Sequence, residues 1–242
     1  MIKFRLYQKY RNHSINEDVH LLTERDFIGA LTALSSSGYP FSSSEIEQCL
    51  DRMSQGSRTS WSWDQTRPKD ICALLKWAQR SHEYYLGFGP GHEQGMGNGN
   101  SVLGLDSKLN TLAGELLTQL QVKAAAVEAK NVLEALSFCA SANSRLQNVH
   151  VHDMDSRSED HVAGDGINGG EAGETRLATA ERSLLKQHIV EITPWLACEL
   201  RRSVQDLTCE EHLCVLQDLI KLREHLEEPE IFLDLMGQFV GN

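Results

Sequence analysis

The sequence predicts an all-α protein, in which an N-terminal pair of helix–loop–helix units precedes a long helix and a helical bundle. Apolar residues recur at helical spacing through much of the chain, as at Phe27, Leu31 and Leu34. Patterns typical of helix N-termini precede several of these stretches. With only five prolines and 7% aromatic residues, the composition disfavours a β-sandwich.

The net charge of −11 is unevenly distributed along the 242 residues. Residues 1–86 carry 11 basic and 10 acidic side chains, whereas residues 87–242 carry 12 basic and 24 acidic ones. Because an acidic body repels phosphate backbones, we expect no nucleic-acid partner. The basic, acid-poor residues 1–16 fit an amphipathic first helix or, alternatively, a mitochondrial transit segment.

No apolar run approaches the roughly 18 residues that a transmembrane helix needs, and no secretory signal peptide is visible. The six cysteines are scattered without a CxxC pair, which indicates reduced, buried thiols rather than a disulfide framework. We therefore expect an intracellular protein in a reducing compartment, either cytoplasmic or mitochondrial. Cys209, His212 and Cys214 do not share one helical face, so helix packing is favoured there over a zinc site.

The first third of the chain divides into helices with clear starts. Thr23 with Asp26, and Ser42 with Glu45, have the spacing at which a side chain caps a helix N-terminus. A third helix opens at Pro68, since proline is well tolerated in a first helical turn. Its apolar stripe consists of Ile71, Leu74, Leu75 and Ala78.

The segments Leu6–Tyr10 and Leu21–Phe27 resemble the first EF-hand of mitochondrial calcium-uptake regulators and calcium-regulated carriers. Residues 42–75 are similar to the general EF-hand pattern of a capped helix, a loop and an aliphatic exit helix. The resemblance covers residues 1–85 and implies a pair of EF-hands. It also implies that hands without ions persist as protein-binding folds.

The calcium ligands that this resemblance requires are mostly missing. An EF-hand loop needs oxygen ligands at positions 1, 3, 5 and 12. Glu17, Asp18 and Asp26 are the candidates in the first loop, but Ile15 falls at its first ligand position. The second loop, taken as 54–65, has no carboxylate at these positions and contains Arg58. We therefore expect no calcium and no other cofactor.

Residues 86–101 contain six glycines and lack the lysine of a phosphate-binding loop. This composition predicts a flexible linker over 87–101. The linker would separate an EF-hand-like domain at residues 1–86 from a helical domain at residues 102–242.

A long helix is predicted over 103–146. Its leucines at 105, 109, 112 and 116 follow the 4-3-4 spacing of a coiled-coil seam. An intramolecular bundle is favoured over dimerisation as the way to cover this seam. Leu109, Leu112 and Leu116 are the candidate contacts for a protein partner or a second copy of the chain.

Residues 148–175 are acidic and glycine-rich, which predicts a disordered loop. Its part from His150 to His161 combines histidines with carboxylates and is the candidate metal cluster, although a solvated loop is favoured. A helix follows over about 177–192, and we expect it either to kink or to restart at Pro194. Further helices are predicted after the capping pair Thr208 and Glu211, and from Pro229.

No catalytic motif with a known mechanism occurs in the sequence. The favoured hypothesis is a non-enzymatic structural or adaptor subunit of an intracellular assembly, which binds proteins through the EF-hand-like module and the long helix. The alternatives are a calcium-responsive regulator with one working EF-hand and a metal-dependent enzyme that uses the His150–His161 segment.

Overall fold

The computed structural model describes residues 23–54, 63–85, 99–156, 171–203, 205, 207–226, 233 and 237, with the backbone alone at 99–103, 148–156 and 171–178. Within this part of the chain the regular elements are helices and there is no strand, so the all-α class is confirmed. The α-helices are α2 (Glu24–Ser36), α3 (Ser43–Ser54), α4 (Pro68–Tyr85), α5 (Gly99–Val122), α6 (Ala129–Ser156), α7 (Glu171–Ser203) and α8 (Cys209–Lys221). Short 3-10 turns, η2 (Ala124–Ala126) and η4 (Arg223–His225), follow α5 and α8.

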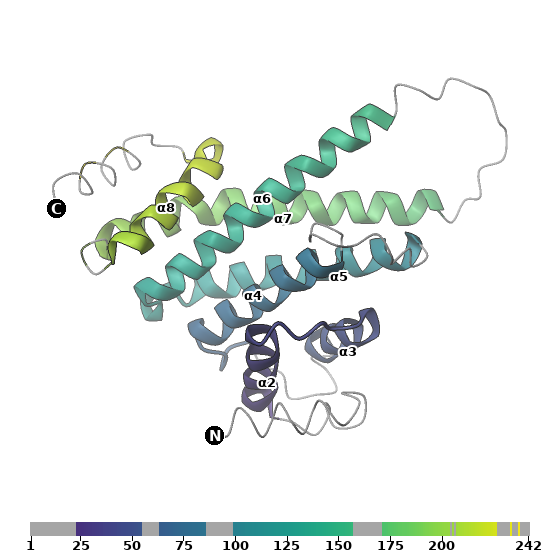
Figure 1. The fold of residues 1–242 in the computed structure, drawn as a ribbon, viewed down its shortest axis with the longest axis horizontal. Helices are drawn as coiled ribbons and strands as arrows, with labels where there is room; N and C mark the ends of the chain where they lie inside the picture. The colour runs from purple at the N-terminus through teal and green to yellow at the C-terminus, as the bar shows by residue number, and fades with distance from the viewer. Residues whose placement is uncertain are drawn as a thin grey trace.

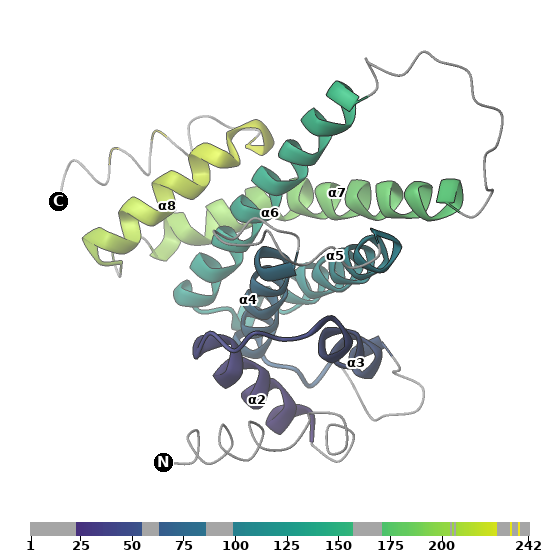
Figure 2. The same ribbon diagram turned by 45° about the vertical axis from the view of Figure 1, so that its right-hand side comes forward.

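Helices α4, α5, α6 and α7 form a central bundle, in which both α4 and α7 pack against α5 and α6 (Figure 1). Helices α5 and α7 run in the same direction, because α6 returns the chain between them. Around this bundle α2 packs on α4, α3 on α5, and α8 on α6 (Figure 2). One hydrophobic cluster extends through these helices from Phe27 to Leu222.

The helix starts expected at Thr23, Ser42 and Thr208 are confirmed. The Thr23 hydroxyl accepts the Asp26 amide at 3.2 Å, and the Ser42 hydroxyl accepts the Glu45 amide at 3.3 Å. At α8, Thr208 and Glu211 form a complete capping box. These contacts satisfy backbone groups that a helix N-terminus would otherwise leave unpaired.

The long helix predicted over 103–146 is wrong, because the chain breaks between α5 and α6. Helix α5 ends at Val122, and Val127 has an extended backbone before α6 begins at Ala129. The intervening alanines favour helix, so tertiary packing overrides local propensity at this turn. Of the two alternatives expected at Pro194, a restart is excluded because α7 continues through this proline, and a kink stays a prediction.

Helices occupy the described ends of the predicted linker and of the predicted acidic loop, so both segments are shorter than expected. Helix α5 already begins at Gly99, and the helical backbone of α6 continues to Ser156, while α7 begins at Glu171. The rest of these two segments, 87–98 and 157–170, lies outside the described residues. The predicted linker does not divide the core, because α4 packs directly on α5 and α6. The helix expected from Pro229 lies largely outside the described part.

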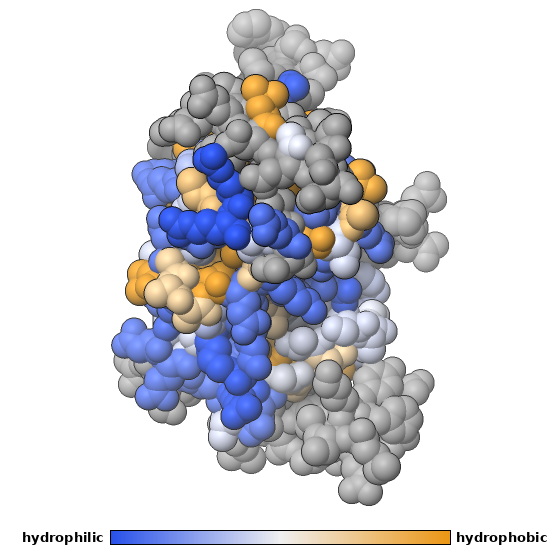
Figure 3. Space-filling view, turned by 90° about the vertical axis from the view of Figure 1, so that its left-hand side faces the viewer, coloured by the Kyte–Doolittle hydropathy of each residue, from blue (hydrophilic) through white to orange (hydrophobic). Residues whose placement is uncertain are grey.

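Exposed hydrophobic residues are scattered over the surface. On the face in Figure 3 they form small separate patches between hydrophilic residues. None of the helices in the described segments is long and apolar enough to cross a membrane.

All six cysteines are free thiols. Cys49, Cys72 and Cys139 are buried as predicted, but Cys198, Cys209 and Cys214 are exposed, so the prediction of burial is wrong for these three.

Candidate functional site

The leucines predicted as partner contacts lie in the core. Leu109, Leu112 and Leu116 are 1%, 6% and 0% exposed. Helices α4 and α7 of the same chain pack against α5. The seam is therefore internal, which agrees with the intramolecular bundle and leaves these three residues no free surface for a partner.

The predicted calcium and metal ligands do not assemble in the described residues. Glu17 and Asp18 lie outside them, and the Asp26 carboxylate accepts the Thr23 hydroxyl at 2.7 Å in the cap of α2. The backbone of the His150–His161 segment is helical to Ser156 rather than extended, and its remainder is not described. Among the described side chains no group of three histidine, cysteine or carboxylate residues could hold a metal ion.

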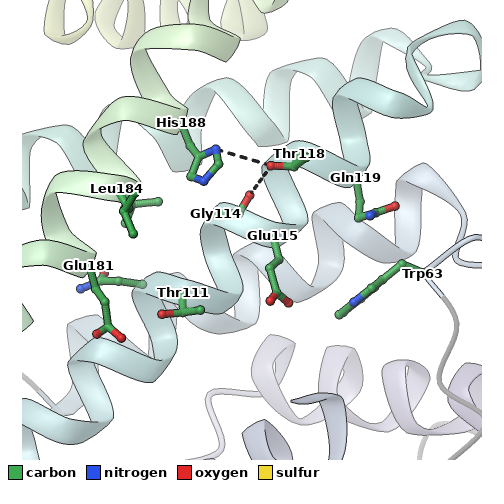
Figure 4. A pocket seen from close by; sticks show the side chains of 11 residues that line it. Trp63, Thr111, Gly114, Glu115, Thr118, Gln119, Glu181, Leu184 and His188 are labelled. Atoms are coloured by element: carbon green, nitrogen blue, oxygen red, sulfur yellow. Dashed lines mark hydrogen bonds between the residues drawn. The ribbon is translucent and has the colours of Figure 1, made fainter. Parts of the chain in front are cut away.

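A groove of about 410 Å³ lies between α5 and α7 and is closed at one end by Trp63 (Figure 4). Because α5 and α7 run in parallel, successive turns of both helices contribute side chains to it. It is lined by Asn110, Thr111, Gly114, Glu115, Thr118 and Gln119 of α5, by Glu181, Leu184, Leu185 and His188 of α7, and by Trp63.

The groove depends on a close approach of α7 to Gly114. A Cβ atom at this position would lie 2.8 Å from His188 Cδ2, so a larger residue would force the imidazole away from its present place against α5. Thr118 holds the same ring, with 3.4 Å between its hydroxyl and His188 Nδ1. Figure 4 shows the two side chains meeting above the groove.

Two carboxylates in the groove have no cation beside them among the described residues. Burial raises the pKa of Glu115, and Glu115 has no ion-pair partner in the described part of the chain. One carboxylate oxygen of Glu181, Oε2, is buried without a hydrogen-bond partner among the described atoms. Leu184, which is 55% exposed, and the partly buried Trp63 add apolar surface next to these charges. The groove therefore combines unpaired negative charge with apolar walls.

A buried polar cluster joins all four helices of the central bundle. Asp106 of α5 is 4% exposed, and Arg182 of α7 donates to it through Nε and Nη2, both at 2.9 Å. His82 of α4 places Nδ1 at 3.3 Å from Asp106 Oδ1. Arg145 of α6 donates to Asn110 Oδ1 of α5 at 3.1 Å. Each bundle helix thus contributes at least one polar side chain.

The charges of this cluster follow from burial and from the neighbouring groups. Burial alone would raise the pKa of Asp106, but His82, Arg182 and Arg145 outweigh it and lower this pKa to about 2. Burial is the main cause that lowers the pKa of His82 to about 4. At neutral pH the cluster therefore contains a charged Asp106 and an uncharged His82.

A broader groove, of about 1140 Å³, lies between α2, α4 and the start of α6. Its lining carries both signs of charge, with Arg25, Lys69 and Lys130 as well as Glu128 and Glu134. This mixture favours no single class of ligand.

No family model matches this chain, and comparison with curated proteins and with solved structures finds no match either. The functional assignment therefore depends on the geometry of the grooves and of the polar cluster. The EF-hand resemblance stays a prediction.

Proposed function

We propose that this chain is a non-enzymatic adaptor subunit of a protein assembly, and that its α5–α7 groove receives a basic side chain of a partner protein. The observation that carries the proposal is the pair of groove carboxylates, Glu115 and Glu181, which lack a cation among the described residues. This site replaces the leucine seam as the partner contact.

An arginine side chain fits the chemistry of the groove better than a neutral one. Its guanidinium group can donate charge-assisted hydrogen bonds to a carboxylate, and these are stronger than bonds between neutral groups. Its methylene stem can pack on the exposed Leu184. The indole of Trp63 offers an aromatic face, and a cation over such a face gains about 0.5–1 kcal/mol at an exposed site.

The charge of the whole chain supports a basic partner as well. The net charge of −11 attracts a basic segment at long range and raises the rate of encounter. The two groove carboxylates would then fix the position of the bound side chain. In many protein–protein complexes, long-range charge attraction raises the association rate while local contacts determine which residue is bound.

The test uses a short peptide with one central arginine and a matched peptide in which citrulline replaces it. Citrulline keeps the shape but removes the positive charge. Binding is followed by NMR at the indole N–H of Trp63, with Trp63→Phe to assign the signal. We expect the arginine peptide to bind and the citrulline peptide to bind at least about tenfold more weakly, a difference of about 1.4 kcal/mol.

Substitutions separate the groove from general charge attraction. We expect Glu115→Gln and Glu181→Gln each to weaken the arginine peptide about fivefold or more. Glu191→Gln is the matched control, because Glu191 is an α7 carboxylate outside the groove that bonds with Gln187. Equal binding of both peptides, or equal weakening by all three substitutions, would show that the groove does not recognise the cation.

A further inference from the structure

Besides the two grooves, a smaller pocket of about 310 Å³ lies between α4 and α6. His82 and Phe138 form a buried floor, each 1% exposed, whereas Glu83, Ser141 and Arg145 line its more accessible rim. Its volume is at the lower end of the range for small-molecule sites in proteins. This pocket is separate from the α5–α7 groove, so it is independent of the proposed function.

The floor of this pocket contains a polar atom that lacks a partner. His82 Nδ1 lies 3.3 Å from Asp106 Oδ1 without hydrogen-bond geometry, and Nε2, on the other side of the ring, likewise has no hydrogen-bond partner among the described atoms. A proton on Nδ1 is stabilised by the Asp106 carboxylate, which leaves the lone pair on Nε2. A buried acceptor without a donor is unfavourable, and a ligand that donates a hydrogen bond would remove this cost.

The charges around the pocket are balanced without a ligand. Arg145 and Arg182 carry two positive charges, and Asp106 and Glu83 carry two negative ones. Glu83 also accepts the Gln79 amide at 2.8 Å. A charged ligand would disturb this balance, so the site favours an uncharged one. The buried ring of Phe138 favours an apolar or aromatic body beside the donor.

We propose that the α4–α6 pocket binds a small uncharged compound in which a hydroxyl group is attached to an apolar ring. The hydroxyl donates to His82 Nε2, and the ring packs on Phe138. Asp106 holds the imidazole in the tautomer that accepts this bond. Ser141 stands at the rim, where a larger side chain would obstruct the pocket.

Phenol and toluene are suitable probes, since they have nearly the same shape and differ in the hydroxyl group. The full chain, labelled with nitrogen-15 in its histidines, is titrated with each compound while the Nε2 resonance of His82 is followed. We expect phenol to shift this resonance in a saturable way in the millimolar range and toluene to leave it unmoved. Affinity for so small a ligand is weak even in a well-formed site.

Two variants complete the test. His82→Phe removes the acceptor and keeps a ring of similar size, and it is expected to weaken phenol at least fivefold. Should this variant not fold, Ser141→Leu narrows the pocket from its rim and is expected to have the same effect on a folded protein. An equal response to toluene would show only an apolar cavity. An Nε2 resonance that is already hydrogen-bonded and does not respond to phenol would show an ordered water. Either result overturns the proposal.

Discussion

Acidification should destabilise this fold through His82, and the size of the effect follows from its environment. The imidazole is buried, and burial together with the nearby Arg145 and Arg182 outweighs the opposing effect of Asp106 and lowers the pKa of His82 from 6.5 to about 4. The unfolded chain therefore binds a proton between these two pH values and the native chain does not. The free energy of unfolding must fall as the pH falls through this window.

The magnitude follows from the difference between the two pKa values. Each pKa unit corresponds to about 1.4 kcal/mol, so the full window is equivalent to about 3 kcal/mol, of which roughly 2 to 3 kcal/mol is lost by about pH 4.5. Above pH 6.5 His82 is neutral in both states and contributes no pH dependence. Asp106 contributes at lower pH. Because its pKa is lowered from 3.8 to about 2, the stability that it provides is lost only as the pH falls below about 4.

Urea unfolding of the wild-type chain and of His82→Gln, measured from pH 7 to about pH 4.5, isolates this contribution. All other titrating groups are common to both proteins and cancel in the comparison. We expect the wild type to lose roughly 2 to 3 kcal/mol more than the variant over this range. Parallel curves for the two proteins would refute the reasoning, because they would mean that His82 is accessible to protons in the native state.

Two further predictions concern the core and the caps. Leu116→Ala should lower the free energy of unfolding by about 2–5 kcal/mol, because Leu116 is fully buried in the α5 seam, and urea unfolding would measure it. Thr208→Ala should cost about 1 kcal/mol through the α8 capping box, a loss that Thr208→Ser should largely avoid in the same assay. Losses below 1 kcal/mol at Leu116, or equal losses for both Thr208 variants, would contradict the burial and the cap.

The helices could be predicted from the sequence where short-range physics decides them. The pairs Thr23 with Asp26 and Thr208 with Glu211 satisfy their own backbone groups locally, so their spacing alone indicates a helix start. The break after Val122 could not be predicted in this way. Its alanines favour helix, and the turn is needed because α6 packs against α4, α7 and α8.

The two candidate sites were not accessible to sequence reasoning, since their residues are far apart in the chain. Glu115 and Glu181 come from helices separated by α6, and Trp63 precedes α4. One signal of the buried polar cluster was present in the sequence. Asp106 and Asn110 each come directly after a seam leucine, and because they are four residues apart they lie on the same face of the helix. Polar residues at such a position indicate buried partners, but they do not identify Arg182 and Arg145 as those partners.

The buried cluster also explains how the α5–α7 groove obtains its shape. A seam of leucines packs nearly as well after a slip of one helical turn, about 5.4 Å, because leucine recurs at every turn. Such a slip would separate Arg182 from Asp106 and leave the buried Asp106 carboxylate without its cation, at a cost of about 3–5 kcal/mol. The pair therefore selects one register of the two parallel helices. In that register Gly114 lies under His188, and Glu115 and Glu181 line the same groove.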